Sequence, residues 1–155
     1  MLRALLIISA LFNGAACPQN GSVQAKTPPP RLGLVKDKSL LGECGCSIYG
    51  TASDLGRDRY VLMSNLDGDA IVNLDGKDTR LRLVGQKDKQ GDLKIGDHTS
   101  QPYSGGEVRL RADFFVTRVC PPTDESCEVT WYRVKVKVYR RGRRTLAWAR
   151  GMCGC

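Results

Sequence analysis

Two Cys-Gly-Cys triplets, Cys44-Gly45-Cys46 and Cys153-Gly154-Cys155, bracket the part of this chain that carries strand patterns. A third local pair, Cys120 and Cys127, flanks a Pro-Pro turn. Six cysteines arranged in pairs within a small domain are typical of disulfides in an oxidising compartment. A bridge inside one triplet would close a very small, strained ring, so we expect bridges between the two triplets, in either order. Such bridges would hold the first strand beside the last.

The segment before the first triplet resembles a targeting sequence. Arg3 precedes an apolar run over residues 4–12, which is too short to span a bilayer about 30 Å thick and suits a signal peptide. Small residues then lead to Cys17, as in the lipobox of bacterial lipoproteins. We therefore expect residues 1–16 to be a signal peptide and Cys17 to be lipidated, which would account for the odd one of seven cysteines. Plain cleavage after Ala16 or Ala25 is the alternative.

Residues 17–38 have no helical or strand period and contain Pro28-Pro29-Pro30. This composition favours an extended, semi-stiff chain, so we expect a lipid-anchored flexible tether that ends at residue 38. Residues 39–155 then form a single domain, which their length allows.

Strand patterns and turn residues dominate that domain. Residues 107–120 alternate apolar and polar side chains, and Asp75-Gly76 joins two extended runs in which Leu74 should oppose Lys77. Further strands are expected near 44–49 and 59–64, with a loop-rich stretch over 85–106. The sequence predicts an all-β, mainly antiparallel small barrel or sandwich of about seven strands, stapled by disulfides.

The last predicted hairpin, residues 129–150, carries most of the charge. Beyond Glu128 there are eight cations and no carboxylate, and the chain has a net charge of +8, so the rest is neutral. A three-residue loop, Arg140-Arg141-Gly142, would bury Leu146 and Trp148 with the valines of the first strand. A two-residue loop, Arg141-Gly142, would move the side chains of the return strand to the opposite faces and place Trp148 opposite Lys135. We expect the first register.

This hairpin is the candidate binding site. Clustered cations on a strand face repel one another, and an anionic partner would relieve that cost. The predicted anion-binding residues are Arg133, Lys135, Lys137, Arg140, Arg141, Arg143 and Arg144. Candidate partners are phospholipid headgroups, lipopolysaccharide phosphates, cell-wall polymers or an acidic protein, besides the membrane that a lipid on Cys17 would enter. Nucleic acid has a suitable charge but belongs to another compartment. A charged strand face that only prevents edge-to-edge pairing is the competing interpretation.

Enzyme classes find little support, and we expect no catalytic residue and no cofactor. His98 is the single histidine, and no nucleophile elbow, P-loop or zinc-protease motif is present. An EF-hand reading of the acidic turns fails because Ile71 and Val72 stand where a calcium ligand and a glycine are needed. The triplets could instead form a redox pair or a metal site, an alternative that an exported chain disfavours.

The C-terminal run Gly151-Met152-Cys153-Gly154-Cys155 and the hairpin sequence over 73–78 resemble a group of small bacterial envelope lipoproteins. That resemblance implies a periplasmic or outer-membrane location and carries no activity with it. Size, signal and hairpin order also resemble, more distantly, the membrane-bound lysozyme inhibitors, which are small β-barrels. No inhibitory motif of those proteins matches residue by residue, and a basic hairpin suits cationic lysozyme poorly. The sequence therefore predicts a non-enzymatic envelope lipoprotein, a binding or structural module whose basic hairpin suits an anionic envelope partner. The alternatives are a lysozyme or hydrolase inhibitor and a periplasmic redox or metal-handling protein.

Overall fold

The computed structural model describes residues 28–41, 44–85, 93–124 and 126–155. The expected signal peptide and the expected lipidation site, Cys17, lie outside these residues. Within the described part of the chain, no helix has the length and apolar character needed to cross a membrane.

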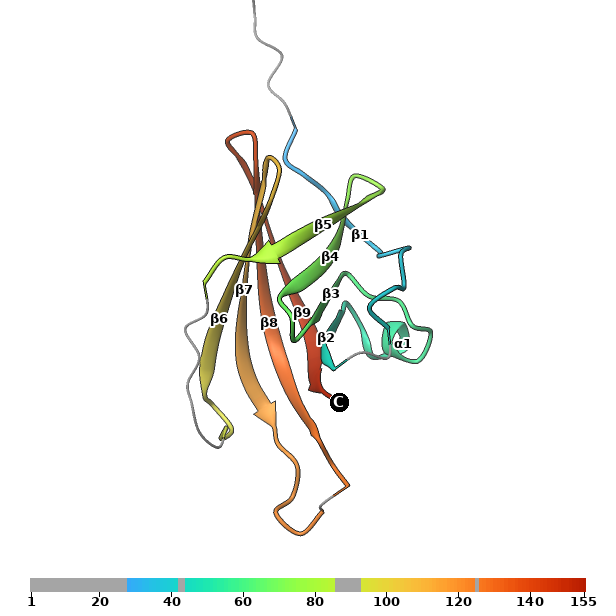
Figure 1. Ribbon diagram of the computed structural model, residues 1–155, viewed down its shortest axis with the longest axis vertical. Coiled ribbons are helices and arrows are strands. Elements are labelled where there is room, and N and C mark those ends of the chain that lie inside the picture. Colours follow the sequence, from blue (N-terminus) through green and yellow to red (C-terminus); the bar gives the residue numbers. More distant parts are fainter. Residues whose placement is uncertain (1–27, 42–43, 86–92, 125) are drawn as a thin grey trace, which may run out of the picture.

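The domain is all-β, as predicted, and it has a single short helix among the described residues (Figure 1). The elements are β1 (Leu32–Gly33), β2 (Gly45–Tyr49), α1 (Ala52–Leu55), β3 (Leu62–Asn65), β4 (Asp69–Leu74), β5 (Lys77–Leu83), β6 (His98–Gly105), β7 (Val108–Arg118), β8 (Val129–Arg140) and β9 (Arg143–Gly154). β6 corrects the expected loop-rich stretch over 85–106, because residues 98–105 of that stretch form a strand. The expected strand over 59–64 begins later, at Leu62.

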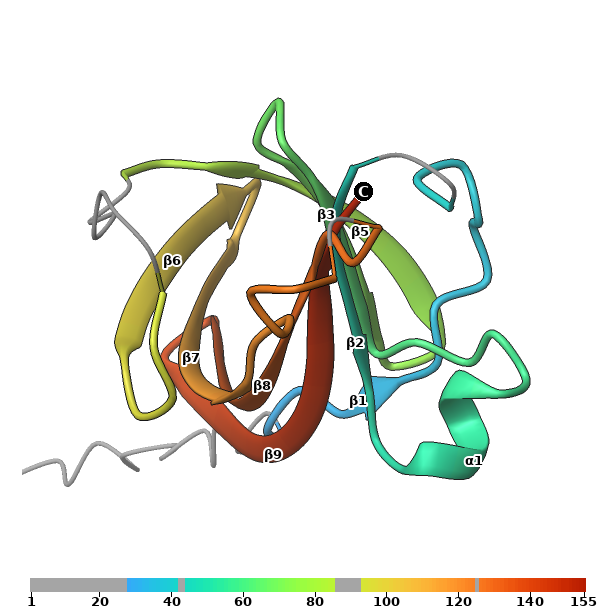
Figure 2. The same ribbon diagram turned by 90° about the horizontal axis from the view of Figure 1, so that it is seen from below.

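Eight strands close into an antiparallel barrel, which resolves the choice between barrel and sandwich (Figure 2). The order around the barrel is β4, β3, β2, β9, β8, β7, β6 and β5, and β5 pairs with β4 to complete the circle. The ninth strand, β1, pairs with residues 73–74 of β4, beyond the residues 70–72 that pair with β3. β1 therefore pairs with the end of β4 that extends beyond the shorter strand β3.

Side chains fill the barrel. The predicted alternation of β7 is confirmed, since Val108, Leu110, Ala112, Phe114 and Val116 are all buried in the interior cluster. The valines of β8 join them with Ile48, Leu62 and Leu81 from the opposite wall. Because the interior is a packed core, chemistry has to be sought on the outer surface.

The predicted β4–β5 hairpin is confirmed in register and in face. Leu74 opposes Lys77 and Ala70 opposes Leu81 across Asp75-Gly76. Both turn residues have positive φ, 52° and 84°, as a type I′ turn requires. Its apolar face points into the barrel core.

The expected register of the β8–β9 hairpin is wrong. Arg140 pairs with Arg143 around a two-residue turn, and Lys135 therefore opposes Trp148. Arg141 and Gly142 have φ of 49° and 71°, so this turn has the same type I′ character as Asp75-Gly76. Leu146 and Trp148, expected inside, point outward and are 45% and 46% exposed.

The small residues of β9 explain this register. Ala147, Ala149 and Gly151 take the inward positions, opposite Val136, Val134 and Tyr132 of β8 respectively. A methyl group at Gly151 would lie only 2.4 Å from Cδ1 of Ile48 on the neighbouring strand β2. The barrel has no room for larger side chains along this strand, so the bulky ones face solvent.

The domain begins earlier than residue 39, so the expected tether is too long at its C-terminal end. β1 pairs with β4, and the backbone amides of Lys36 and Asp37 donate to the Asp78 carboxylate at 2.8 and 2.6 Å. Val35 and Leu40 are buried in a second apolar cluster on the outside of β2–β4, with Tyr49, Tyr60, Met63 and Ile71. This cluster also contacts Leu55 of α1, which covers the same side of the barrel (Figure 2).

The two triplets are joined to each other, as predicted. The bridges run from Cys44 to Cys155 and from Cys46 to Cys153, and they connect neighbouring strands β2 and β9. The central glycines allow close approach of the strands on the other sides of β2 and β9: a Cβ on Gly45 would lie 1.9 Å from the Ser64 carbonyl oxygen of β3, and one on Gly154 would lie 2.0 Å from the Glu128 carbonyl oxygen. The first and last barrel strands are therefore linked by hydrogen bonds and by two covalent bonds.

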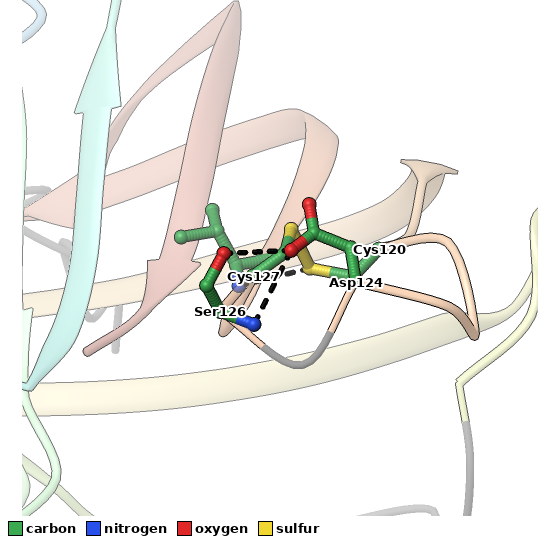
Figure 3. Close-up of a disulfide and its surroundings, with 5 residues drawn as sticks. Cys120, Asp124, Ser126 and Cys127 are labelled. Atoms are coloured by element: carbon green, nitrogen blue, oxygen red, sulfur yellow. Dashed lines mark hydrogen bonds between the residues drawn. A yellow bond between two sulfur atoms is a disulfide. The ribbon is translucent and has the colours of Figure 1, made fainter.

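The third predicted disulfide, Cys120–Cys127, closes the β7–β8 connection (Figure 3). Within this loop the backbone amide and hydroxyl of Ser126 donate to Asp124 Oδ1 at 3.2 and 2.6 Å. The Val129 amide donates to Cys120 Sγ at 3.3 Å, which ties the bridge to the start of β8. The connection is consequently fixed at both of its ends.

Candidate functional site

The outward-facing residues of β7, β8 and β9 form one continuous surface, which we call the outer wall. Strand registers place in it Arg109, Arg111, Asp113, Phe115, Arg133, Lys135, Lys137, Tyr139, Arg144, Leu146, Trp148 and Arg150. These residues include seven cations and a single carboxylate. Tyr139, Leu146 and Trp148 remain 42–46% exposed, whereas α1 and the segment before β2 cover the opposite side of the barrel.

The one carboxylate of the outer wall, Asp113, is buried and fully engaged. Lys137 Nζ and Arg111 Nε lie 2.8 and 2.7 Å from its oxygens. Ser100 of β6 donates a third hydrogen bond at 2.8 Å. Burial alone would raise the pKa of Asp113, but the hydrogen bonds from these donors lower it to about 2. The ionised Asp113 carboxylate is therefore fully paired with cations of the outer wall, and it neutralises part of their charge.

The cations at the tip of the β8–β9 hairpin are also paired. Arg140 reaches across the end of the barrel to Asp75 in the β4–β5 turn, and Arg141 Nε lies 2.6 Å from Glu107 Oε2. The backbone amide of Arg31 and the Arg140 side chain hold the pKa of Asp75 below its usual range, against a smaller opposing effect of burial. Three of the predicted anion-binding residues, Lys137, Arg140 and Arg141, are thus committed to internal ion pairs.

The remaining cations of the outer wall are associated with aromatic rings. The Arg133 guanidinium carbon lies 4.2 Å from the centroid of the Trp148 ring, and Lys135 Nζ lies 5.4 Å from it. Arg118, at the end of β7, stacks on Trp131 of β8 at 3.3 Å. A β-bulge between Val116 and Arg118 changes the register there. Within the described part of the chain, Arg118, Arg133 and Lys135 form no ion pair.

These stacks line a groove of about 700 Å³ that crosses the outer surface of β8 and β9, between the ends of β7 and β2. We call it the Trp groove; its charged and indole-bearing lining residues are Arg118, Trp131, Arg133, Trp148 and Arg150. None of its lining residues is acidic. A second hollow of about 920 Å³ lies between the tips of the β6–β7 and β8–β9 hairpins, where Glu107 accompanies the arginines. Four arginines with one glutamate and three arginines alone give the same formal net charge, but only the Trp groove has no acidic side chain in its lining.

The predicted anion-binding set is only partly brought together. Arg133, Lys135 and Lys137 do share one face, but the corrected register brings Arg144 to that face in place of Arg143. Arg140 and Arg141 belong to the tip, about half a strand away from the Trp groove along β8. Whether these residues bind an anion stays a prediction.

Sequence reasoning missed the aromatic half of the site and the residues that flank it. Trp148 was expected in the core, and Trp131, Arg118 and Asp113 were given no role. The two-residue turn Arg141-Gly142, which resembles Asp75-Gly76, carried the signal for the correct register. His98, expected in a loop, is the exposed first residue of β6 and stacks on Phe115 at 4.6 Å.

Comparison with protein-family models, with curated proteins and with solved structures gives no match for this chain. The three disulfides are consistent with an oxidising, exported location. In the described residues no three histidine, cysteine or acidic side chains are grouped so that they could hold a metal ion.

Proposed function

We propose that this protein is a non-enzymatic binding module of the bacterial cell envelope that holds an anionic partner on its outer wall. A signal peptide over residues 1–16 and a lipid on Cys17 would bring the domain to the membrane surface. The short segment between Cys17 and the start of the packed chain would let the barrel stand clear of that surface.

The observation that carries the proposal is the composition of the outer wall. Seven cations share this face with one carboxylate, and that carboxylate is buried and already paired. Cations such as Arg133 and Lys135 are held beside Trp148 rather than beside an acid. A wall that served only to keep the barrel from associating would not need three large apolar side chains exposed among its charges.

The ion pairs at the hairpin tip favour a contact region further along the outer wall, at Arg133 and Lys135. Arg140 and Arg141 would have to leave Asp75 and Glu107 before binding a partner, whereas Arg133 and Lys135 have no carboxylate to leave among the described residues. Each cation near an anionic surface contributes about 1 kcal/mol, screened by salt. Loss of two such cations should therefore weaken binding by roughly thirtyfold.

The experiment compares two double variants on the same anionic ligands. Arg133→Gln with Lys135→Gln removes the free cations of the wall, and Arg140→Gln with Arg141→Gln removes the paired cations of the tip. Lys77→Gln, an exposed cation on the far wall of the barrel, is the matched single-charge control. Retention on vesicles that contain anionic phospholipid and on immobilised anionic polymers is measured at increasing salt concentration.

We expect salt-sensitive retention of the unaltered protein, a large loss in the wall variant and a smaller loss in the tip variant. The Lys77→Gln control should bind like the unaltered protein. A larger effect at the tip would place the site elsewhere, and absence of retention on every anionic ligand at low salt would overturn the proposal.

A further inference from the structure

The Trp groove has the features of a site for a ring-bearing anion. It contains both tryptophans of the chain and three arginines, and none of its lining residues is acidic. Strands β7, β8, β9 and β2 supply its walls, so its shape is set by the barrel and the inter-triplet disulfides rather than by a loop. A rigid scaffold of this kind holds binding groups in place before the ligand arrives.

The two arginine–tryptophan stacks preserve the binding capacity of the arginines. Arg118 lies over Trp131 at 3.3 Å and Arg133 over Trp148 at 4.2 Å, so each guanidinium is held against an indole face. The N–H groups of a guanidinium point outward in its own plane, so stacking leaves them available for bidentate contact with a carboxylate or phosphate. In the described chain, the side chains of Arg118, Arg133 and Arg150 donate no hydrogen bond to protein.

The shape of the surface distinguishes a single polymer chain from a bilayer. A bilayer-binding protein presents apolar side chains where it protrudes, but the protruding tip here is Arg140-Arg141-Gly142-Arg143-Arg144. The tryptophans lie instead in a groove between strand ends. An extended chain can enter such a groove, whereas a flat bilayer cannot.

The half-exposed indole of Trp148 distinguishes a sugar from a peptide. The face of a pyranose ring carries C–H groups that pack flat against an aromatic ring, and a uronic acid adds a carboxylate at the edge of that ring. Trp148 offers the apolar surface, and Arg133 and Arg150, which are paired across β8 and β9, offer the cations. A linear acidic peptide would use the cations and leave the indole surface unused.

We propose that the Trp groove binds an acidic glycan chain, with a sugar ring on the exposed part of the Trp148 indole and carboxylates on Arg133, Arg150 and Arg118. This inference rests on the proposed function, because it names the anionic partner of the outer wall.

The test compares oligogalacturonate, which carries one carboxylate on each ring, with oligoglutamate of matched charge, which has no rings. Binding to the full chain with its disulfides formed is followed by tryptophan fluorescence and calorimetry, with a neutral glucose oligomer and anionic phospholipid vesicles as further ligands. Trp148→Leu is the test variant, and Leu66→Ala is its control, because Leu66 is an exposed apolar residue between β3 and β4, outside both the outer wall and the groove.

We expect oligogalacturonate to bind at least about tenfold more tightly than oligoglutamate, with the neutral glycan weaker still. Trp148→Leu should remove that preference while leaving oligoglutamate binding within about twofold, and Leu66→Ala should change neither. Circular dichroism of the Trp148→Leu variant checks that the barrel is intact.

Other outcomes separate the two claims. Equal affinity for both oligomers, with both lost in the Arg133→Gln variant, overturns the glycan assignment but still supports anion binding by the outer wall. Vesicle binding without glycan binding also overturns it, in favour of a membrane surface. Absence of binding to every anion overturns the glycan assignment and the proposed function together.

Discussion

Lys135 of β8 and Trp148 of β9 lie directly opposite each other on the outside of the barrel. The ammonium group of Lys135 is 5.4 Å from the centroid of the indole ring, on the side of the sheet away from the core. This pairing fixes which side chains of the two strands face solvent and which face the barrel interior. Cations and large apolar residues thereby share one surface.

The exposed position of Trp148 predicts a small effect on stability. Trp148→Ala should lower the free energy of unfolding by less than about 1 kcal/mol, because the side chain leaves no cavity in the core. Val136→Ala, inside the barrel, should cost about 2 kcal/mol. Urea unfolding of both variants measures the difference, and a loss of about 3–5 kcal/mol for Trp148→Ala would indicate that the indole is buried after all.

Asp113 predicts an acid-sensitive component of stability. Its pKa is about 2 in the folded protein, below the value near 4 that an unfolded aspartate has. The favourable contribution of its ion pairs is therefore complete above about pH 4 and is lost as the pH falls toward 2. We expect roughly 1–2 kcal/mol to disappear over this range in the unaltered protein.

Asp113→Asn should remove that component of the pH profile. A double-mutant cycle with Lys137→Gln should give a coupling free energy of about 1–2 kcal/mol at pH 7, since the Lys137 Nζ–Asp113 Oδ2 distance is 2.8 Å. Denaturant unfolding at several pH values provides both measurements. An additive cycle and an unchanged acid profile would show that this ion pair contributes little.

The two inter-triplet disulfides should act as one cross-link. Each closes a loop of more than 100 residues, the sequence separations being 111 and 107. On chain-entropy grounds such a loop stabilises by about 4–5 kcal/mol, but once one bridge exists the second closes only a few more residues. Replacing Cys46 and Cys153 by Ala should thus cost only about 1–2 kcal/mol, and replacing all four cysteines about 4–5 kcal/mol or more.

Unfolding in denaturant, with intact mass to confirm the remaining bridges, tests this non-additivity. The Cys120→Ala, Cys127→Ala variant is a comparison with a separation of 7 residues, for which about 2 kcal/mol is expected. The account would be contradicted if removing one inter-triplet bridge lowered the free energy of unfolding as much as removing both. It would also be contradicted if each bridge contributed the same amount and the two losses simply added.

Local patterns predicted the parts of the fold that local physics determines. Asp75-Gly76 can form one kind of tight turn, so the β4–β5 register followed from it. The alternation in β7 identified its buried face. The pairing of the triplets followed from the size of the ring that each triplet would otherwise close.

The β8–β9 register could not be decided by such patterns. Both loop lengths place Gly142 at positive φ, and burial of Leu146 and Trp148 looked favourable when the hairpin was considered alone. The contact that excludes it comes from another strand: Ile48 of β2 approaches Gly151 so closely that β9 must present its small residues inward. The segment around β1 and Lys36 could not be placed from local patterns for the same reason. It is held by contacts with Asn73, Asp75 and Asp78, which lie 40 or more residues later in the sequence.

The most direct test of anion binding by the outer wall is a nuclear magnetic resonance titration of the ¹⁵N-labelled protein with a short linear polyphosphate. The chain has two tryptophans, Trp131 and Trp148, and both line the Trp groove, so its indole N–H signals report on that groove. We predict that both indole signals and the backbone amides of Arg133, Lys135 and Arg150 shift most, and that added salt reverses the shifts. Changes confined to Arg140–Arg144 or to β4 and β5, or no change at low ionic strength, would contradict the account.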